Sequence, residues 1–167
     1  MKKRMAVNRK MRERRYLREA RLAAGYSSRC EASMAIPYAP ETLGRHERGE
    51  TAIGPEDAVL YAECYDRPDI LYRYCSECPV GQRIGMKTTD RDLPWAALRI
   101  NQRLRKAKEV ADTLEDIAED GIVDETERPK FEAALAYLRE LSCIITDILV
   151  WNYAQPRKHS ASSGGRA

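Results

Sequence analysis

The chain has 167 residues, of which 43% are hydrophobic and 33% charged, and its net charge is +3. This length allows one ordinary domain or a small domain with an appendage. No run of about 18 apolar residues exists and no apolar segment follows the basic N-terminus, which excludes a membrane span and a secretory signal. We therefore expect a cytoplasmic protein, not inserted in a membrane, with five cysteines that are thiols or metal ligands rather than disulfides.

The positive charge is concentrated at the N-terminus. Residues 1–21 contain ten Lys or Arg and two Glu, a net charge of +8, whereas residues 94–155 contain eight basic and twelve acidic residues, a net charge of −4. This asymmetry favours binding of a polyanion at one end of the chain. Residues 1–12 lack apolar periodicity, and we predict that they form a flexible basic arm.

Two short helices are predicted after this arm. Apolar residues recur at helical spacing over 13–24, and Gly25 suits the end of that helix. Ser28 can cap a second helix, with Glu31 three residues later as its capping-box partner. Because proline cannot continue a helix, we expect the second helix to end just before Pro37.

A third and a fourth helix are expected to begin at prolines. Pro40 and Pro55 suit the first helical position, and Gly49 suits the end of the third helix. A short helix or turn is expected at 69–75, and the proline and glycines of 75–85 indicate irregular backbone. The positions that we expect to face the core are Ile36, Tyr38, Leu43, Val59, Leu60 and Ala62.

Two long helices are predicted over 93–154. Apolar residues recur in alternating steps of four and three, which is typical of helices that pack along a seam, and a short loop between them indicates an antiparallel helical hairpin. A surplus of apolar residues favours either a homodimer through this hairpin or packing on the first domain. The small polar residues of 155–167 predict a disordered tail. The expected seam positions are Ile100, Leu104, Ala107, Ala111, Leu114 and Ala118, then Phe131, Leu135, Leu138, Leu141 or Ser142, Ile145, Ile148 or Leu149, and Asn152.

The first four helices resemble a known DNA-binding domain. The segments "LREARLAAGYSS" and "TLGRHERGE", together with Ala32, resemble the domain shared by lambda repressor and Cro, the XRE-type regulators. The resemblance covers about residues 16–65, and it implies an all-α helix-turn-helix whose third helix enters the major groove of double-stranded DNA. We predict that this domain extends over 13–86, including a cysteine-containing extension.

The same resemblance assigns roles to individual residues. Arg45 suits a bidentate contact to guanine, and Glu41 can accept a hydrogen bond from cytosine N4. We interpret Gly44 as clearance for close approach to DNA, and Glu47 as a structural partner for an N–H group or an arginine. The alternative for Arg45 and Arg48 is a charged face that contacts only solvent. The candidate DNA-binding residues are Ser28, Arg29, Pro40, Glu41, Thr42, Arg45 and Arg48.

Two patterns match metal sites only in part. Cys75 and Cys78 form a C-x-x-C pair, but a tetrahedral zinc site needs two further ligands, so we expect packed free cysteines. Residues 116–127 match several positions of a calcium-binding loop, but Ala118 stands where an oxygen ligand is needed. We expect a helix end followed by a helix start there.

These patterns together predict a sequence-specific DNA-binding transcriptional regulator of bacterial or phage type. A protein-interaction adaptor that uses the helix-turn-helix as a scaffold, or a metal-binding sensor, are the alternatives. The chain has two histidines, no Ser/His/Asp set and no phosphate-binding glycine loop, so we expect neither enzyme activity nor a cofactor.

Overall fold

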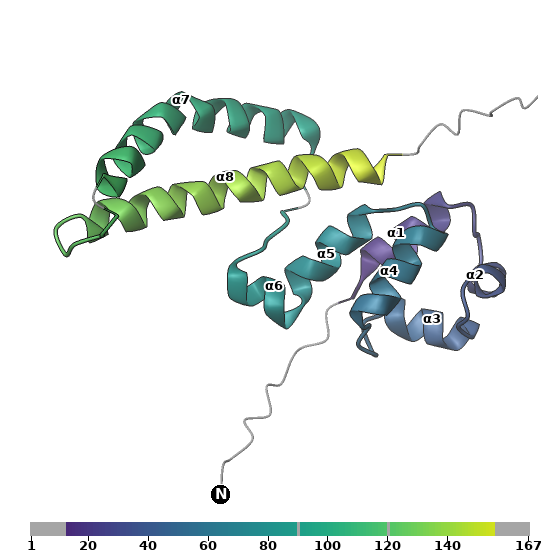
Figure 1. Cartoon of the computed structure of the whole chain (residues 1–167). Helices are drawn as coiled ribbons and strands as arrows, with labels where there is room; N and C mark the ends of the chain where they lie inside the picture. The colour runs from purple at the N-terminus through teal and green to yellow at the C-terminus, as the bar shows by residue number, and fades with distance from the viewer. Residues whose placement is uncertain (1–12, 90, 120, 156–167) are drawn as a thin grey trace, which may run out of the picture. The chain divides into compact units, whose positions relative to one another are not determined.

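The computed structural model describes residues 13–89, 91–119 and 121–155. Over these residues the chain is all-α, with eight helices and no strand, which confirms the predicted class (Figure 1). The helices are α1 (Arg15–Ala23), α2 (Arg29–Ala35), α3 (Pro40–Glu47), α4 (Pro55–Cys64), α5 (Asp69–Glu77), α6 (Pro79–Ile84), α7 (Leu93–Ala118) and α8 (Arg128–Ala154). None of them combines the length and the apolar character that crossing a bilayer requires.

The contacts divide the chain into two compact units, Met1–Leu71 and Tyr72–Ala167. This division falls within α5, and the domain limits 13–86 and 93–154 remain predictions. The predicted basic arm at 1–12 and all of the predicted tail except its first residue lie outside the described residues.

Local signals in the sequence determine the helix ends of the first unit. The Ser28 hydroxyl accepts a hydrogen bond from the Glu31 N–H, and the Glu31 carboxylate accepts one from the Ser28 N–H, which completes the predicted capping box. Pro40 and Pro55 occupy first helical turns as expected. Gly49 follows α3 with a φ of 72°, a left-handed conformation that favours glycine.

The core of the first unit takes buried apolar residues from α1 to α5 and from the loops between them. Ile36 and Leu43 are each 1% exposed, as predicted. The prediction for α4 was wrong at Val59, which is 44% exposed, and at Leu60, which is only half-buried. The inward face of α4 is instead centred on Tyr61, because its hydroxyl bonds a buried side chain of α3. The buried apolar residues of this unit are Tyr16, Leu17, Ala20, Ala32, Ile36, Leu43, Ile53, Ala58, Tyr61, Ala62, Tyr65 and Ile70.

The expectation of irregular backbone over 75–85 was wrong, because α5 runs to Glu77 and α6 begins at Pro79. The Cys78 Sγ accepts a hydrogen bond from the Gly81 N–H at 3.2 Å, which caps α6. Proline and glycine thus mark the two ends of a short helix here rather than its absence.

The two long helices α7 and α8, of 26 and 27 residues, run side by side in opposite directions (Figure 1). Arg99 and Arg103 of α7 both pair with Glu140 of α8, and the Tyr137 hydroxyl donates to the Arg103 carbonyl oxygen. These polar contacts set the rotation of each helix about its own axis.

The predicted seam of α7 and α8 was wrong at several positions. Leu104 is 56%, Leu138 41% and Ile145 43% exposed, and Ala111, Ala118 and Asn152 are also exposed. The apolar residues of α8 cover so much of its circumference that the spacing alone leaves its rotation open. The residues that are buried in this helix pair are Ala96 and Ile117 of α7, and Ala134, Ile144, Asp147 and Val150 of α8.

Candidate functional site

A groove of about 720 Å³ lies where α1, α2 and α3 meet. Six of the seven residues that the sequence nominated line this groove, and Thr42 is the exception, half-buried on α3. Helix α3 packs against both α1 and α2, and the groove forms where these three helices meet. The lining residues are Arg18, Arg21, Ser27, Ser28, Arg29, Cys30, Pro40, Glu41, Gly44, Arg45 and Arg48.

The groove collects positive charge from a segment, residues 13–71, in which acidic residues outnumber basic ones. Residues 13–71 contain eight arginines, no lysine and eleven acidic residues. Five of the eight arginines line the groove, and Glu41 is its one acidic lining residue. Clustering of one sign of charge in a concave surface focuses its electrostatic field. The groove is therefore suited to an anionic ligand.

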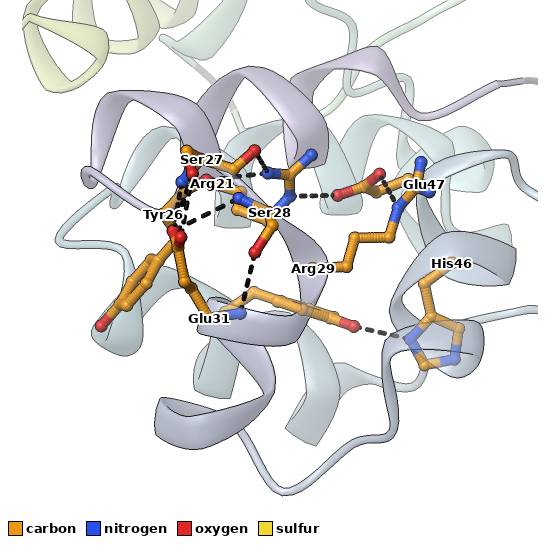
Figure 2. A network of polar contacts seen from close by, with 9 residues as sticks. Arg21, Tyr26, Ser27, Ser28, Arg29, Glu31, His46 and Glu47 are labelled. Atoms are coloured by element: carbon orange, nitrogen blue, oxygen red, sulfur yellow. Dashed lines mark hydrogen bonds and ion pairs between the residues drawn. The ribbon is translucent and has the colours of Figure 1, made fainter.

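The carboxylate of Glu47, at the end of α3, organises the floor of this region (Figure 2). Its Oε1 accepts from the Nε of Arg21 at 2.7 Å, and its Oε2 accepts from the Nε of Arg29 at 2.8 Å. Glu47 is 6% exposed, and the Arg21 side chain, from α1, is 5% exposed. The structural role predicted for Glu47 is confirmed, because its buried carboxylate connects α1, α2 and α3. One carboxylate faces two guanidinium groups here, so one positive charge is left uncompensated.

Arg21 and Arg29 differ in what they can offer a ligand. Arg21 also donates to the carbonyl oxygens of Tyr26 and Ser27, so internal partners engage its Nε and one terminal nitrogen. The side chain of Arg29 is 39% exposed, and its bond to Glu47 uses only Nε. The two terminal nitrogens of Arg29 are thus positioned at the groove by an internal acid.

The N-terminus of α2 contributes hydroxyl groups to the groove. The Ser27 hydroxyl donates to the Glu31 carboxylate at 3.0 Å, in addition to the capping box that Ser28 forms (Figure 2). Hydrogen bonds from the Ser27 hydroxyl and from the Ser28 N–H hold the pKa of Glu31 below its ordinary value. The first turn of α2 is therefore ordered by its own side chains.

The exposed edge of α3 carries two arginines, Arg45 and Arg48, of which only Arg48 has an ion-pair partner among the described residues. Arg48 forms a bidentate pair with Glu50, at 2.6 and 2.9 Å, and both side chains are about half exposed. The side chain of Arg45, like that of Arg18 of α1, makes no hydrogen bond or ion pair within the part of the chain that the structure describes. Arg45 is therefore the α3 side chain most available to an incoming ligand.

Gly44 lies between two arginine side chains. A Cβ atom built on it would be 3.0 Å from Nη1 of Arg48 and 3.5 Å from Nε of Arg29. Gly44 lines the groove, and the groove is deeper there because the residue has no side chain. The atoms nearest to the position of the missing Cβ belong to the side chains of Arg48 and Arg29.

A second buried polar pair supports α3 from below. His46 Nδ1 lies 2.7 Å from the Tyr61 hydroxyl of α4, and His46 is 4% exposed. Burial lowers the pKa of His46 below its ordinary value, and burial raises the pKa of Tyr61. A neutral His46 thus attaches α3 to α4, and the Tyr38 hydroxyl bonds Asp57 beside it.

The sequence reasoning missed the contribution of α1. Arg18 and Arg21 were counted only as part of an N-terminal excess of charge, yet both line the groove. Their spacing of three residues places them on one side of a helix, and this signal could have nominated them.

The structure offers no metal centre among residues 13–89, 91–119 and 121–155, where no three His, Cys, Asp or Glu side chains are close enough together to hold an ion. Asp120 of the calcium-loop pattern lies outside these residues. As expected, α7 ends at Ala118 and α8 starts after this loop, with the Asp124 carboxylate accepting from the N–H groups of Thr126 and Glu127.

Comparisons with protein-family models, with curated proteins and with solved structures found no match to this chain.

Proposed function

We propose that the protein is a sequence-specific DNA-binding regulator of bacterial or phage type, in which α2 and α3 act as a lambda-repressor-like helix-turn-helix. The observation that carries this proposal is the arginine-lined groove. Five arginines and two serines meet there beside the exposed edge of α3, although acidic residues outnumber basic ones over residues 13–71. DNA carries one phosphate charge per about 1.7 Å of duplex, and arginine clusters are the usual means of binding it.

In the proposed complex, α3 enters the major groove with its N-terminal turn and exposed edge against the bases. Arg45 donates two hydrogen bonds to guanine, because its guanidinium has no competing partner among the described residues. Glu41 accepts from cytosine N4, while Pro40 and Thr42 contact a thymine methyl group.

Phosphate binding falls to the rim of the groove. Arg29 presents two terminal nitrogens and Ser28 a hydroxyl, and Arg48 exchanges its pair with Glu50 for a phosphate. These contacts fix the position of the protein on the duplex but carry no sequence information. A basic arm at 1–12 adds further phosphate contacts in this proposal.

The second unit serves to pair two copies in the cytoplasm. Its two long helices act as an antiparallel hairpin that dimerises, so that two recognition helices meet two half-sites about one turn of DNA apart. The operator should therefore be an inverted repeat.

Selection from a pool of random duplexes, using the full chain, tests the proposal. We expect one sequence family to be enriched, and Arg45→Ala to lose about 1–3 kcal/mol of preference at one guanine. Arg105→Ala, an exposed arginine of α7, is the matched control and should leave that preference unchanged. If no sequence is enriched, and Arg45→Ala alters neither DNA affinity nor its salt dependence, the proposal fails.

An adaptor for acidic peptides is the second candidate. The observation that favours it is that the arginines of this region already bind a carboxylate, that of Glu47. An adaptor would bind acidic peptides and random DNA with similar salt dependence and would enrich no sequence.

A further inference from the structure

Cys75 and Cys78 lie one turn apart where α5 ends and α6 begins. Cys75 belongs to the last turn of α5, and Cys78 follows that helix and caps α6. The two residues between the cysteines are helical, and the Cys78 N–H donates to the Tyr74 carbonyl oxygen at 2.8 Å. Helical geometry places Cα atoms three residues apart at a distance of about 5 Å. This separation is inside the range of about 4.4–6.8 Å that a disulfide spans.

The first turn of α6 packs against both cysteines at Gly81. The Cys78 Sγ accepts a hydrogen bond from the Gly81 N–H at 3.2 Å. A Cβ atom built on Gly81 would lie 1.6 Å from the Cys75 carbonyl oxygen and 3.5 Å from the Cys78 Sγ. The Cys78 sulfur therefore lies close to the backbone of Cys75. Both cysteines are half-buried rather than enclosed, so a small reagent can reach them.

The sulfur contacts of this pair differ from those of the other half-buried thiols. The thiols of Cys64 and Cys143 each donate to a backbone carbonyl oxygen, at 3.6 and 3.5 Å. Cys78 instead accepts a hydrogen bond, and the Cys75 sulfur has no hydrogen-bond partner among the described residues. Within those same residues, no third His, Cys, Asp or Glu side chain is close enough to complete a metal site with the pair. The two thiols are therefore available to react with each other.

We propose that Cys75 and Cys78 form a redox-active dithiol that closes reversibly to a disulfide, with a low-molecular-weight disulfide such as oxidised glutathione as the oxidant. In the resting protein both cysteines are thiols. A disulfide of this kind is transient and redox-sensing rather than a structural cross-link. The proposal goes beyond DNA binding and does not depend on it.

The reaction takes place in two thiol–disulfide exchanges. Cys78 gives its proton to solvent, and its sulfur attacks one sulfur of the reagent, whose S–S bond breaks and releases one thiolate that takes up a proton. Cys75 then loses its proton, and its sulfur attacks the Cys78 sulfur of the mixed disulfide and releases the second reagent thiol. Two cysteine thiols are thus oxidised to one disulfide, and one reagent disulfide is reduced to two thiols.

The surroundings of the two sulfurs set the order of these exchanges. Burial, with the neighbouring Cys78 as a smaller cause, raises the pKa of the Cys75 thiol above its ordinary value. Cys75 therefore presents little thiolate to an external reagent, and Cys78 reacts first. The second exchange is intramolecular, and the proximity of the two sulfurs compensates for the small thiolate fraction of Cys75.

Mass spectrometry of the full chain, equilibrated with reduced and oxidised glutathione, tests the proposal. After free thiols are alkylated, the tryptic peptide of residues 74–83 reports on the pair alone, because it contains these two cysteines and no other. We expect this peptide to lose both of its free thiols without gaining glutathione, and dithiothreitol to restore both. This measurement uses the wild-type chain and does not depend on the folding of any variant.

Two variants test the assigned order. Cys75→Ser should stop the reaction after the first exchange, so that Cys78 retains one glutathione. Cys143→Ser is the matched control, because it removes a half-buried thiol that lies outside the pair, and the peptide of residues 74–83 should still lose both thiols.

Three results would overturn the inference. The first is a wild-type peptide that keeps both thiols free, or that carries glutathione with no disulfide. The second is a disulfide that joins either cysteine to a different cysteine or to a second chain. The third is a Cys75→Ser variant with no glutathione on Cys78, which would contradict the order of the exchanges. The DNA selection reports separately on the groove in each case.

Discussion

Replacing Glu47 with glutamine should destabilise the first unit and spare the second. The substitution keeps the size of the side chain but removes the charge that compensates Arg21, whose side chain is only 5% exposed. Arg21 would retain hydrogen bonds to the carbonyl oxygens of Tyr26 and Ser27, which carry no net charge. Leaving one partner of a buried ion pair uncompensated costs about 3–5 kcal/mol.

The distribution of tryptophan allows the two units to be followed separately. Both tryptophans, Trp95 and Trp151, belong to the second unit, so their fluorescence reports its unfolding in urea, while far-UV circular dichroism reports both units. We expect Glu47→Gln to lower the urea midpoint of the first unit and to leave the tryptophan transition in place. Glu50→Gln is the control, because its pair with Arg48 is about half exposed and should contribute little. Equal midpoints for the two variants would refute the role assigned to Glu47.

Three further predictions concern single positions. Gly44→Ala should raise the free energy of unfolding by about 0.5–1 kcal/mol, because the atom nearest to the new Cβ, at 3.0 Å, is the terminal Nη1 of the half-exposed Arg48 side chain, which can move aside, and Arg29 Nε lies at an ordinary contact distance of 3.5 Å. Improved DNA binding by this variant would refute clearance as the role of the glycine. Gly81→Ala should lower the free energy of unfolding by about 3 kcal/mol, because the new Cβ would lie 1.6 Å from the Cys75 carbonyl oxygen. A variant whose tryptophan transition in urea is unchanged would contradict this contact. The lowered pKa of His46 means that the unfolded chain binds the proton more readily, so the stability that His46 provides is complete above about pH 6.5 and decreases as the pH falls below that value. His46→Gln should abolish this decrease in urea titrations between about pH 7 and pH 5.

Helix ends were predictable because they depend on residues that are near one another in the sequence. The capping box at Ser28 and the prolines at 40 and 55 act on the helix in which they stand, and the structure has them as predicted. The segment after Cys78 was misread because a proline followed by glycines also suits a helix of six residues with its own cap.

The rotation of the long helices was not predictable from spacing. Two adjacent stripes on α8 both satisfy the heptad pattern, and the choice between them depends on pairs such as Arg99 with Glu140, which are 41 residues apart. The same distinction applies to the groove. The residues that α3 contributes to the groove could be nominated from the local sequence pattern. The pairing of Arg21 with Glu47 could not, because it is a tertiary contact between residues 26 positions apart.

The bond between Arg29 and Glu47 has a consequence for the entropy of binding. An arginine that is free in solvent loses side-chain freedom when it closes on an anion, at a cost of about 0.5–1.5 kcal/mol. Arg29 has already lost that freedom on folding, since Glu47 holds its Nε at 2.8 Å, whereas Arg45 has not. Anion binding through Arg29 should therefore show a smaller entropic penalty than binding through Arg45, and calorimetry of the two alanine variants would resolve the difference.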